Sequence, residues 1–154
     1  MNPVAVNRKA HHDYFLFDKL EAGISLLGSE VKSIREGKVN LKDSFVRIIR
    51  EEAFLYNCHI SPYSRIQGYQ EIDPTRFRKL LLKKEEINRL LGRATQKGYA
   101  IIPLALYFKR GLVKLEIALA KGKKEYDKRE SIKKRIHDRE SQAAMKHHAR
   151  KKAM

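Results

Sequence analysis

The clearest pattern in the chain is an alternation of apolar and polar residues in its last third. Apolar residues stand at every second position from Val113 to Leu119, which is the period of a strand with one buried face. Residues 99–108 are rich in Ile, Leu and aromatic residues, and the Lys-Arg-Gly sequence at 109–111 is typical of a tight turn. We therefore predict a β-hairpin, with Pro103 at a sheet edge or a bulge because proline lacks a ladder N–H.

Shorter patterns predict the remaining elements. Further strands are predicted at residues 14–17, 22–27, 45–49 and 53–56. Helical spacing predicts one helix over 30–36, which Ser29 caps and Gly37 ends, and another over 83–96, which covers an open end of the sheet. The fold class is therefore mainly β: an antiparallel β-barrel resembling the oligonucleotide-binding (OB) fold, with about two or three short helices.

The chain divides into a folded body and a basic tail. Lys and Arg number 34 against 18 Asp and Glu, a net charge of +16, and half of that charge falls in residues 121–154. Apart from the terminal Met154, the only large aliphatic side chains of this tail are Ile132, Ile136 and Met145, too few to offset the entropy of ordering its backbone. We predict a folded body over residues 1–120 and a tail over 121–154 that is disordered when free.

Several classes of function are not favoured by the sequence. No apolar run is long enough to span a bilayer or to act as a signal peptide, so we expect a cytoplasmic protein with no membrane partner. The single Cys58 has no partner for a disulfide or a zinc site, and no phosphate-binding glycine loop occurs. We therefore predict no catalytic residues, no metal and no cofactor.

Two short sequences place a histidine next to a residue that could assist it in catalysis. His11 and His12 adjoin Asp13, but adjacent side chains on a strand point to opposite faces, so neither a metal pair nor a base with an orienting acid is expected. Cys58 next to His59 is better interpreted as a buried small residue than as a nucleophile with its base. The protein is therefore not predicted to be an enzyme.

The excess of positive charge predicts a polyanionic partner, and the distribution of rings makes RNA the favoured one. Basic residues alternate with aromatic or imidazole rings in residues 8–14 and again in residues 76–79. Cations neutralise phosphates, while rings stack on unpaired bases. For any one of these residues, a solvated charge or a core ring is an equally good interpretation, so the prediction depends on their joint density.

Six strings in this order resemble the SsrA-binding protein (small protein B) family. They are NRKAHHDY at 7–14, EAGISLLGSEVKSIR at 21–35, GKVNLKDS at 37–44, HISPY at 59–63, DPTRFRKLLL at 73–82 and GKKEYDKR at 122–129. The resemblance implies a bacterial partner of transfer-messenger RNA that brings this RNA to stalled ribosomes for rescue by trans-translation. It also implies an OB-like body that grips the tRNA-like domain in place of an anticodon arm.

The resemblance also implies which residues do this. On the RNA face it places Asn7, His12, Tyr14, Glu21, Leu81 and Lys83, where Lys83 departs from the Asn often found in the family. The complete predicted RNA-binding set adds the nearby cations Arg8, Lys9, Lys32, Arg35, Arg76, Arg78 and Lys79. The tail is expected to become helical in the empty message channel of the small ribosomal subunit. The predicted ribosome-engaging residues are Gly122, Lys123, Lys124, Tyr126, Asp127, Lys128 and Arg129.

Glu21 is the one acid in the predicted RNA face. A carboxylate only accepts hydrogen bonds, so it can select base amino groups or ribose hydroxyls, whereas cations supply affinity. We expect a monomer whose partners are transfer-messenger RNA and the ribosome at its decoding region. The alternative is a ribosomal or ribosome-assembly protein of the OB class that binds ribosomal RNA, and a hydrolase acting on RNA is a third, less favoured class.

Overall fold

The computed structural model describes residues 2–63 and 72–152. The chain forms two compact units, Met1–Gly122 and Lys123–Met154, and each is described by itself. The boundary between the units lies two residues after the end of the body predicted over residues 1–120. In the described ranges, no helix is both long and apolar enough to cross a membrane.

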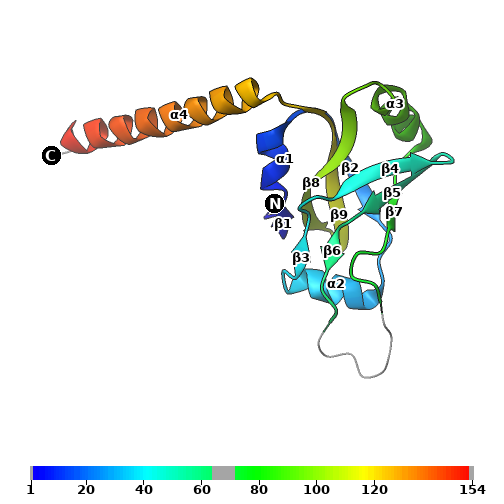
Figure 1. Cartoon of the computed structure of the whole chain (residues 1–154). Helices are drawn as coiled ribbons and strands as arrows, with labels where there is room; N and C mark the ends of the chain where they lie inside the picture. The colour runs from blue at the N-terminus through cyan, green and yellow to red at the C-terminus, as the bar shows by residue number, and fades with distance from the viewer. Residues whose placement is uncertain (1, 64–71, 153–154) are drawn as a thin grey trace. The chain divides into compact units, whose positions relative to one another are not determined.

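The predicted hairpin is present as strands β8 (Tyr99–Lys109) and β9 (Leu112–Gly122), which pair along their length (Figure 1). The alternating apolar side chains of β9 are buried. Arg110 and Gly111 both have positive φ, 52° and 77°, as the tight turns that match strand twist require. The register shifts between Pro103 and Ala105, so the predicted bulge at the proline is confirmed.

Strand β2 (Tyr14–Ile24) replaces two predicted strands with one. It pairs with β9 from Tyr14 to Gly23, with a register shift between Phe17 and Leu20. Asp18, at a φ of 49°, lies in this irregular part. Two charged residues interrupt the alternation at 18–19, and the bulge absorbs them without ending the strand. Sequence alternation alone therefore showed a break where the backbone shows only an irregularity.

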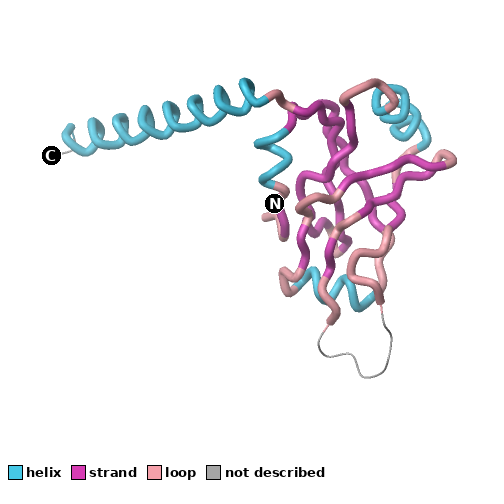
Figure 2. Tube along the Cα trace, viewed as in Figure 1, coloured by secondary structure: helices cyan, strands magenta, loops and turns pink. Residues whose placement is uncertain are grey.

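The other strands complete a mainly antiparallel sheet (Figure 2). They are β1 (Ala5–Val6), β4 (Phe45–Ile49), β5 (Glu52–Tyr56) and β7 (Arg78–Leu81), while β3 (Val39–Asn40) and β6 (His59–Ile60) form a small second sheet. The large sheet has the order β1-β8-β4-β5-β7-β2-β9, and β9 also pairs with β8. The pairing of β9 with β8 brings the sheet back on itself. Because a single residue pair, Val46 with Ile101, joins β4 to β8, the sheet is not a clean barrel.

Three short helices belong to the first unit: α1 (Arg8–Asp13), α2 (Gly28–Arg35) and α3 (Lys84–Ala94). Helices α2 and α3 lie near opposite ends of the sheet, close to the predicted ranges (Figure 1). Helix α2 begins at Gly28, so Ser29 lies inside it and is not its cap. Ile87 and Leu90 face inward from α3. Helix α1 corrects the expectation that residues 11–13 lie on a strand, because Asn7 caps a helix there: its side-chain oxygen accepts the Ala10 N–H at 3.1 Å.

The core lies between the curled strands. Leu55, Leu106, Leu115 and Ile117 are fully buried in it, together with Ile34 from α2. A second, smaller cluster forms where Ala10 of α1 packs on β8 and β9. Helix α1 is therefore fixed to the outside of the hairpin by apolar contacts as well as by its cap.

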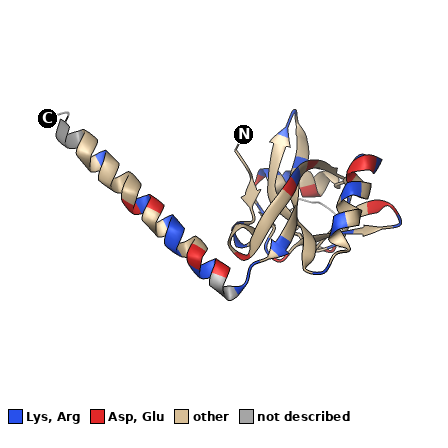
Figure 3. Ribbon diagram, turned by 90° about the horizontal axis from the view of Figure 1, so that it is seen from above, with Lys and Arg blue, Asp and Glu red and all other residues tan. Residues whose placement is uncertain are grey.

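The second unit contains a single helix, α4 (Glu125–Lys152). Its described side chains are mostly exposed, and Lys, Arg, Asp and Glu follow one another along it (Figure 3). Ile132, Ile136 and Met145 are exposed too. Many of its residues are good helix formers, which accounts for the helix. Because its three apolar side chains are exposed, they contribute little buried surface to stabilise it. The expectation that the free tail is disordered in water stays a prediction.

Removal of residues 123–154 should leave the stability of the first unit nearly unchanged. All residues of its buried clusters precede Lys121, so the truncated chain keeps its buried apolar surface. We expect the melting temperature to change by no more than about 2 °C, a few tenths of a kcal/mol. Calorimetry of the two chains tests this, and a loss of roughly 10 °C would show that the tail supports the fold.

Candidate nucleic-acid interface

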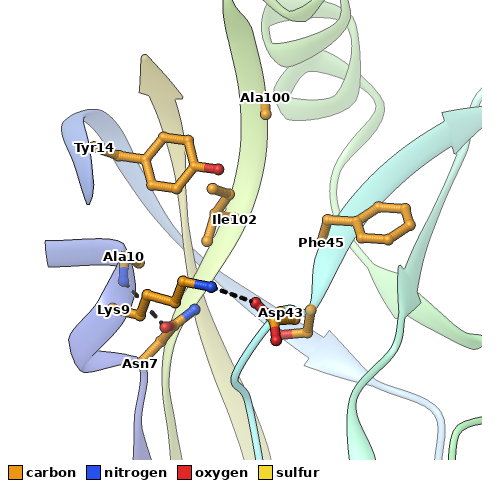
Figure 4. Close-up of a pocket in the computed structure, with 9 residues that line it drawn as sticks. Asn7, Lys9, Ala10, Tyr14, Asp43, Phe45, Ala100 and Ile102 are labelled. Carbon is orange, nitrogen blue, oxygen red and sulfur yellow. Dashed lines mark hydrogen bonds and ion pairs between the residues drawn. The ribbon is translucent and has the colours of Figure 1, made fainter. Parts of the chain in front are cut away.

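Three of the predicted RNA-binding residues line one pocket between α1 and β4. Asn7, Lys9 and Tyr14 surround a space of about 210 Å³, with Phe45 and Asp43 on the opposite side (Figure 4). The ring of Tyr14 points toward the strand that carries Ala100 and Ile102, while the ring of Phe45 points away from the pocket (Figure 4). The pocket therefore presents one cation and one phenol at its rim.

Asn7 itself is not free to bind RNA through its side chain. It is only 5% exposed, and its amide donates to the Pro103 carbonyl at 2.9 Å while its oxygen caps α1. Asn7 thus joins the start of α1 to the bulge of β8. Its role in the pocket is to position Lys9 and Arg8, both exposed on α1, rather than to contact a ligand directly.

Lys9 has a partner that the sequence did not reveal. Its ammonium lies 2.8 Å from the carboxylate of Asp43, and both side chains are exposed. The hydrogen bond and charge of Asp43 raise the pKa of Lys9, and those of Lys9 lower the pKa of Asp43. An exposed pair of this kind is weak, so a phosphate can displace Asp43 from Lys9.

His12 and Asp13 do interact, which corrects the expectation from a strand. The His12 Nδ1 lies 2.7 Å from the Asp13 carboxylate, because successive side chains on a helix are about 100° apart and not on opposite faces as on a strand. Such a pair holds the imidazole ring in one orientation. His12 is half-buried and remains available at its outer edge for stacking or for a hydrogen bond.

A second pocket brings together predicted residues from two distant parts of the chain. Glu21 of β2, Lys79 and Leu81 of β7, and Lys83 before α3 line a space of about 600 Å³. Leu81 is 57% exposed although it is apolar. A Cβ on Gly23 would lie 3.1 Å from the Leu81 Cβ, so glycine lets this leucine lie across the neighbouring strand.

Glu21 is held in place by the β8–β9 hairpin. The Tyr107 hydroxyl donates to one carboxylate oxygen, and the Lys109 ammonium lies 3.3 Å from the other. The hydrogen bond from Tyr107 is the main cause that holds the pKa of Glu21 below its usual range, and Lys109 contributes to it. Burial raises the pKa of Tyr107, and the hydrogen bond to Glu21 raises it further. Glu21 is therefore a fixed, ionised acceptor at neutral pH. Sequence analysis missed Tyr107 and Lys109, which are 86 and 88 residues away.

The prediction for Arg78 is corrected by its burial. Arg78 is 1% exposed, and its guanidinium contacts the Glu30 carboxylate at 2.6 Å and the Cys58 carbonyl at 2.8 Å. Arg76 also donates to Glu30 but is partly exposed. Burial raises the pKa of Glu30, but the hydrogen bonds from Arg76, the Leu27 N–H and Arg78 together outweigh it and lower the pKa. Arg78 is a structural cation.

Two predicted cations lie apart from both pockets, on the exposed side of α2. The Lys32 ammonium lies 5.5 Å from the centre of the Tyr63 ring, and the Arg35 guanidinium lies 5.8 Å from that of Phe108. The structure therefore does not gather Lys32 and Arg35 with the other predicted residues. They add positive charge at a third place on the surface.

The predicted tail residues surround the start of α4. Gly122 ends β9, the Lys123 ammonium donates to Ser131 at 2.9 Å, and the Lys124 N–H donates to Asp127 at 3.4 Å. Asp127 thus helps to begin the helix, a position where a negative charge is favourable. Lys128 and Arg129 follow in the first turns, and the side chain of Tyr126 lies outside the described residues.

The described residues hold no group of three or more His, Cys, Asp or Glu side chains that could bind a metal ion. Cys58 is buried, and burial raises the pKa of its thiol to about 11. A thiol in this state is a poor nucleophile at neutral pH. It packs in the core, as the sequence indicated.

The fold and the two pockets define a class: a basic, mainly antiparallel β protein with exposed cations, rings and one fixed carboxylate on its sheet, suited to a polyanion such as RNA. Comparison with known proteins makes this specific. The SmpB protein family matches residues 4–147, and the chain belongs to this family.

Individual relatives agree. An SsrA-binding protein of Caldicellulosiruptor bescii is 58% identical over 147 residues, 96% of this chain and 92% of the relative. One of Thermoanaerobacter pseudethanolicus is 60% identical over 132 residues, 86% of this chain and 84% of the relative. A solved structure described as "tmRNA-SmpB: a journey to the center of the bacterial ribosome" is similar with a TM-score of 0.66 at 49% identity, over 78% of this chain and 84% of that one.

Proposed function

We propose that this protein binds the tRNA-like domain of transfer-messenger RNA and delivers that RNA to stalled ribosomes for trans-translation. Membership of the SmpB family and the relatives described as SsrA-binding proteins support this. The observation that carries it is the pocket where Glu21, Leu81 and Lys83 converge from separate elements. These three residues are the ones that the family resemblance places on the RNA.

The pocket of Glu21 can distinguish one RNA from another. The carboxylate accepts hydrogen bonds, and Tyr107 and Lys109 hold it ionised in one position. It therefore accepts hydrogen bonds from base amino groups or ribose hydroxyls that face it, and its negative charge repels a phosphate at the same place. Leu81 offers an apolar surface to the face of a base, while Lys83 and Lys79 attract the backbone on either side.

The rest of the proposal follows from the body and the tail. The first unit is an OB-like barrel in this proposal. The pairing of β9 with β8 at the far side of the strand order, together with helices at the ends of the sheet, supports it. We propose that residues 121–154 are disordered in the free protein and form a helix in the empty message channel, where rRNA phosphates neutralise their positive charge. The protein would act as a cytoplasmic monomer without catalysis or cofactor.

Replacing Glu21 by glutamine tests the proposal. The variant should bind the tRNA-like domain about tenfold more weakly, roughly 1.4 kcal/mol, because an amide replaces part of the acceptor with a donor. Binding of an unrelated hairpin RNA should change by less than about twofold, because phosphate contacts dominate it. Filter binding or fluorescence anisotropy with both RNAs measures the difference.

Glu85→Gln is the matched control, because Glu85 is exposed on α3 and does not line the pocket. It removes the same charge and should leave both affinities nearly equal to the parent's. Equal effects of the two substitutions would remove Glu21 from the RNA site. Recovery of ribosomal RNA alone with the purified protein would favour a ribosomal or assembly protein instead.

A further inference from the structure

Strands β4 and β5 carry a strip of aromatic rings and one arginine on their outer face. Phe45 pairs in register with Tyr56, and Arg47 pairs with Phe54. The residues between them, Val46 on β4 and Leu55 on β5, are buried in the core. Because successive side chains alternate between faces, these rings point outward. Phe77, which precedes β7, joins the same strip and is 59% exposed.

The rings of the strip are arranged as a stack. The centres of Phe45 and Tyr56 are 5.4 Å apart with ring planes 7° from parallel, and those of Tyr56 and Phe77 are 5.9 Å apart at 28°. Phe54 meets Phe77 edge to face. The Arg47 guanidinium lies 5.1 Å from the centre of Phe45 and 5.9 Å from that of Tyr56. The arginine thus lies against two rings, and among the described residues no salt bridge is found for it.

The strip connects the two pockets described above. Phe45 also lines the pocket of Lys9 and Tyr14. At the other end, Phe54 pairs in register with Lys79, which lines the pocket of Glu21. A path of rings and cations therefore crosses the outer sheet from one pocket to the other.

We propose that this strip, made of Phe45, Arg47, Phe54, Tyr56 and Phe77, is a binding site for unpaired nucleotides of RNA. Flat rings and a guanidinium plane stack on nucleobases of any sequence, and the adjacent cations attract the phosphates. The net charge of +16 favours a polyanion over a neutral apolar partner. The rings and the guanidinium then favour RNA over an acidic protein, because only RNA supplies flat bases that stack on them. The site needs only a single strand, so it does not depend on recognition of a tRNA-like domain.

A short single-stranded RNA tests the site with the full chain. The probe is a nonamer that carries 2-aminopurine at its centre, whose fluorescence falls when the base stacks on a ring. The parent protein should bind and quench it. Phe77→Leu keeps an apolar side chain but removes the ring, and should weaken binding about fivefold or more and reduce the quenching. Phe77→Ala should do the same, and thermal melting checks that both variants fold.

Charge is separated from stacking by a pair of arginine substitutions. Arg47→Gln and Arg89→Gln remove the same charge, but Arg89 is exposed on α3 and does not line the pockets that Phe45 and Arg47 line. Arg47→Gln should weaken probe binding at least threefold more than Arg89→Gln. Equal effects of the two, full affinity and quenching in Phe77→Leu, or no binding by the parent would each overturn the site. Loss of transfer-messenger RNA binding in Glu21→Gln alone would leave it intact.

Discussion

Replacing Glu30 by glutamine should lower the free energy of unfolding by about 3–5 kcal/mol at pH 7, because it leaves a buried arginine without its counter-charge. Glu30 is 4% exposed and Arg78 is 1% exposed. Arg78 also holds the carbonyls of Cys58 and Pro74, so it cannot turn toward water without breaking those hydrogen bonds. Urea unfolding of the parent and the variant measures the loss.

Arg76→Met is the control for this prediction. Arg76 binds the same carboxylate but is partly exposed, and Arg78 remains to neutralise Glu30 in that variant. We expect a loss of about 1 kcal/mol or less, as for other partly exposed ion pairs. If Glu30→Gln is no more destabilising than Arg76→Met, the buried pair does not stabilise the fold.

The same pair predicts a dependence on pH. The pKa of Glu30 is lower in the folded chain than in the unfolded chain, where it is about 4.3. Its contribution is therefore present above that value and is lost as the pH falls through the folded pKa. The difference in stability between the parent and Glu30→Gln should narrow as the pH falls below about 4.

The parts of the fold that the sequence predicted are those set by local patterns. The hairpin of β8 and β9 was predicted because alternation, a turn and a proline bulge all lie within residues 99–119. Helix α1 was missed because its six residues bury only Ala10, and its start depends on Asn7 reaching the Pro103 carbonyl 96 residues away. A local pattern cannot show that contact.

The site was predicted in the same partial way. Family strings pointed to Glu21, Leu81 and Lys83, but the contacts that fix Glu21 come from β8. The positive charge of Arg78 predicts RNA binding in the same way as that of Arg76 and Lys79, but charge does not show that Arg78 is buried. A signal for its burial was present: in a strand it shares a face with Leu80, which is in the core. The cross-strand stack of Phe45 and Tyr56 needed the register of β4 and β5.

Replacing Asp127, Lys128 and Arg129 together by alanine should abolish peptide tagging on stalled ribosomes and leave RNA binding by the body within about threefold, under roughly 1 kcal/mol. The three residues lie in the first turns of α4, in a compact unit separate from the one that holds the pockets of Lys9 and Glu21. Alanine is the best helix former, so the variant keeps the helix propensity of these positions, although it loses the hydrogen bond that Asp127 accepts from the Lys124 N–H. What it loses is the set of charges that would meet rRNA at the start of the tail.

The decisive comparison measures RNA affinity and tagging in one reconstituted translation system, with a second triple variant as control. Lys134, Asp138 and Arg139 are exposed on later turns of α4, and their replacement by alanine removes one acid and two bases, as in the test variant. If the ribosome reads the start of the tail, the control should retain most of its tagging while the test variant retains none. Parallel losses of affinity and tagging would show that the tail only adds grip on RNA. Full tagging by the test variant would show that residues 127–129 have no required role, because the remaining helix would then suffice to fill the message channel.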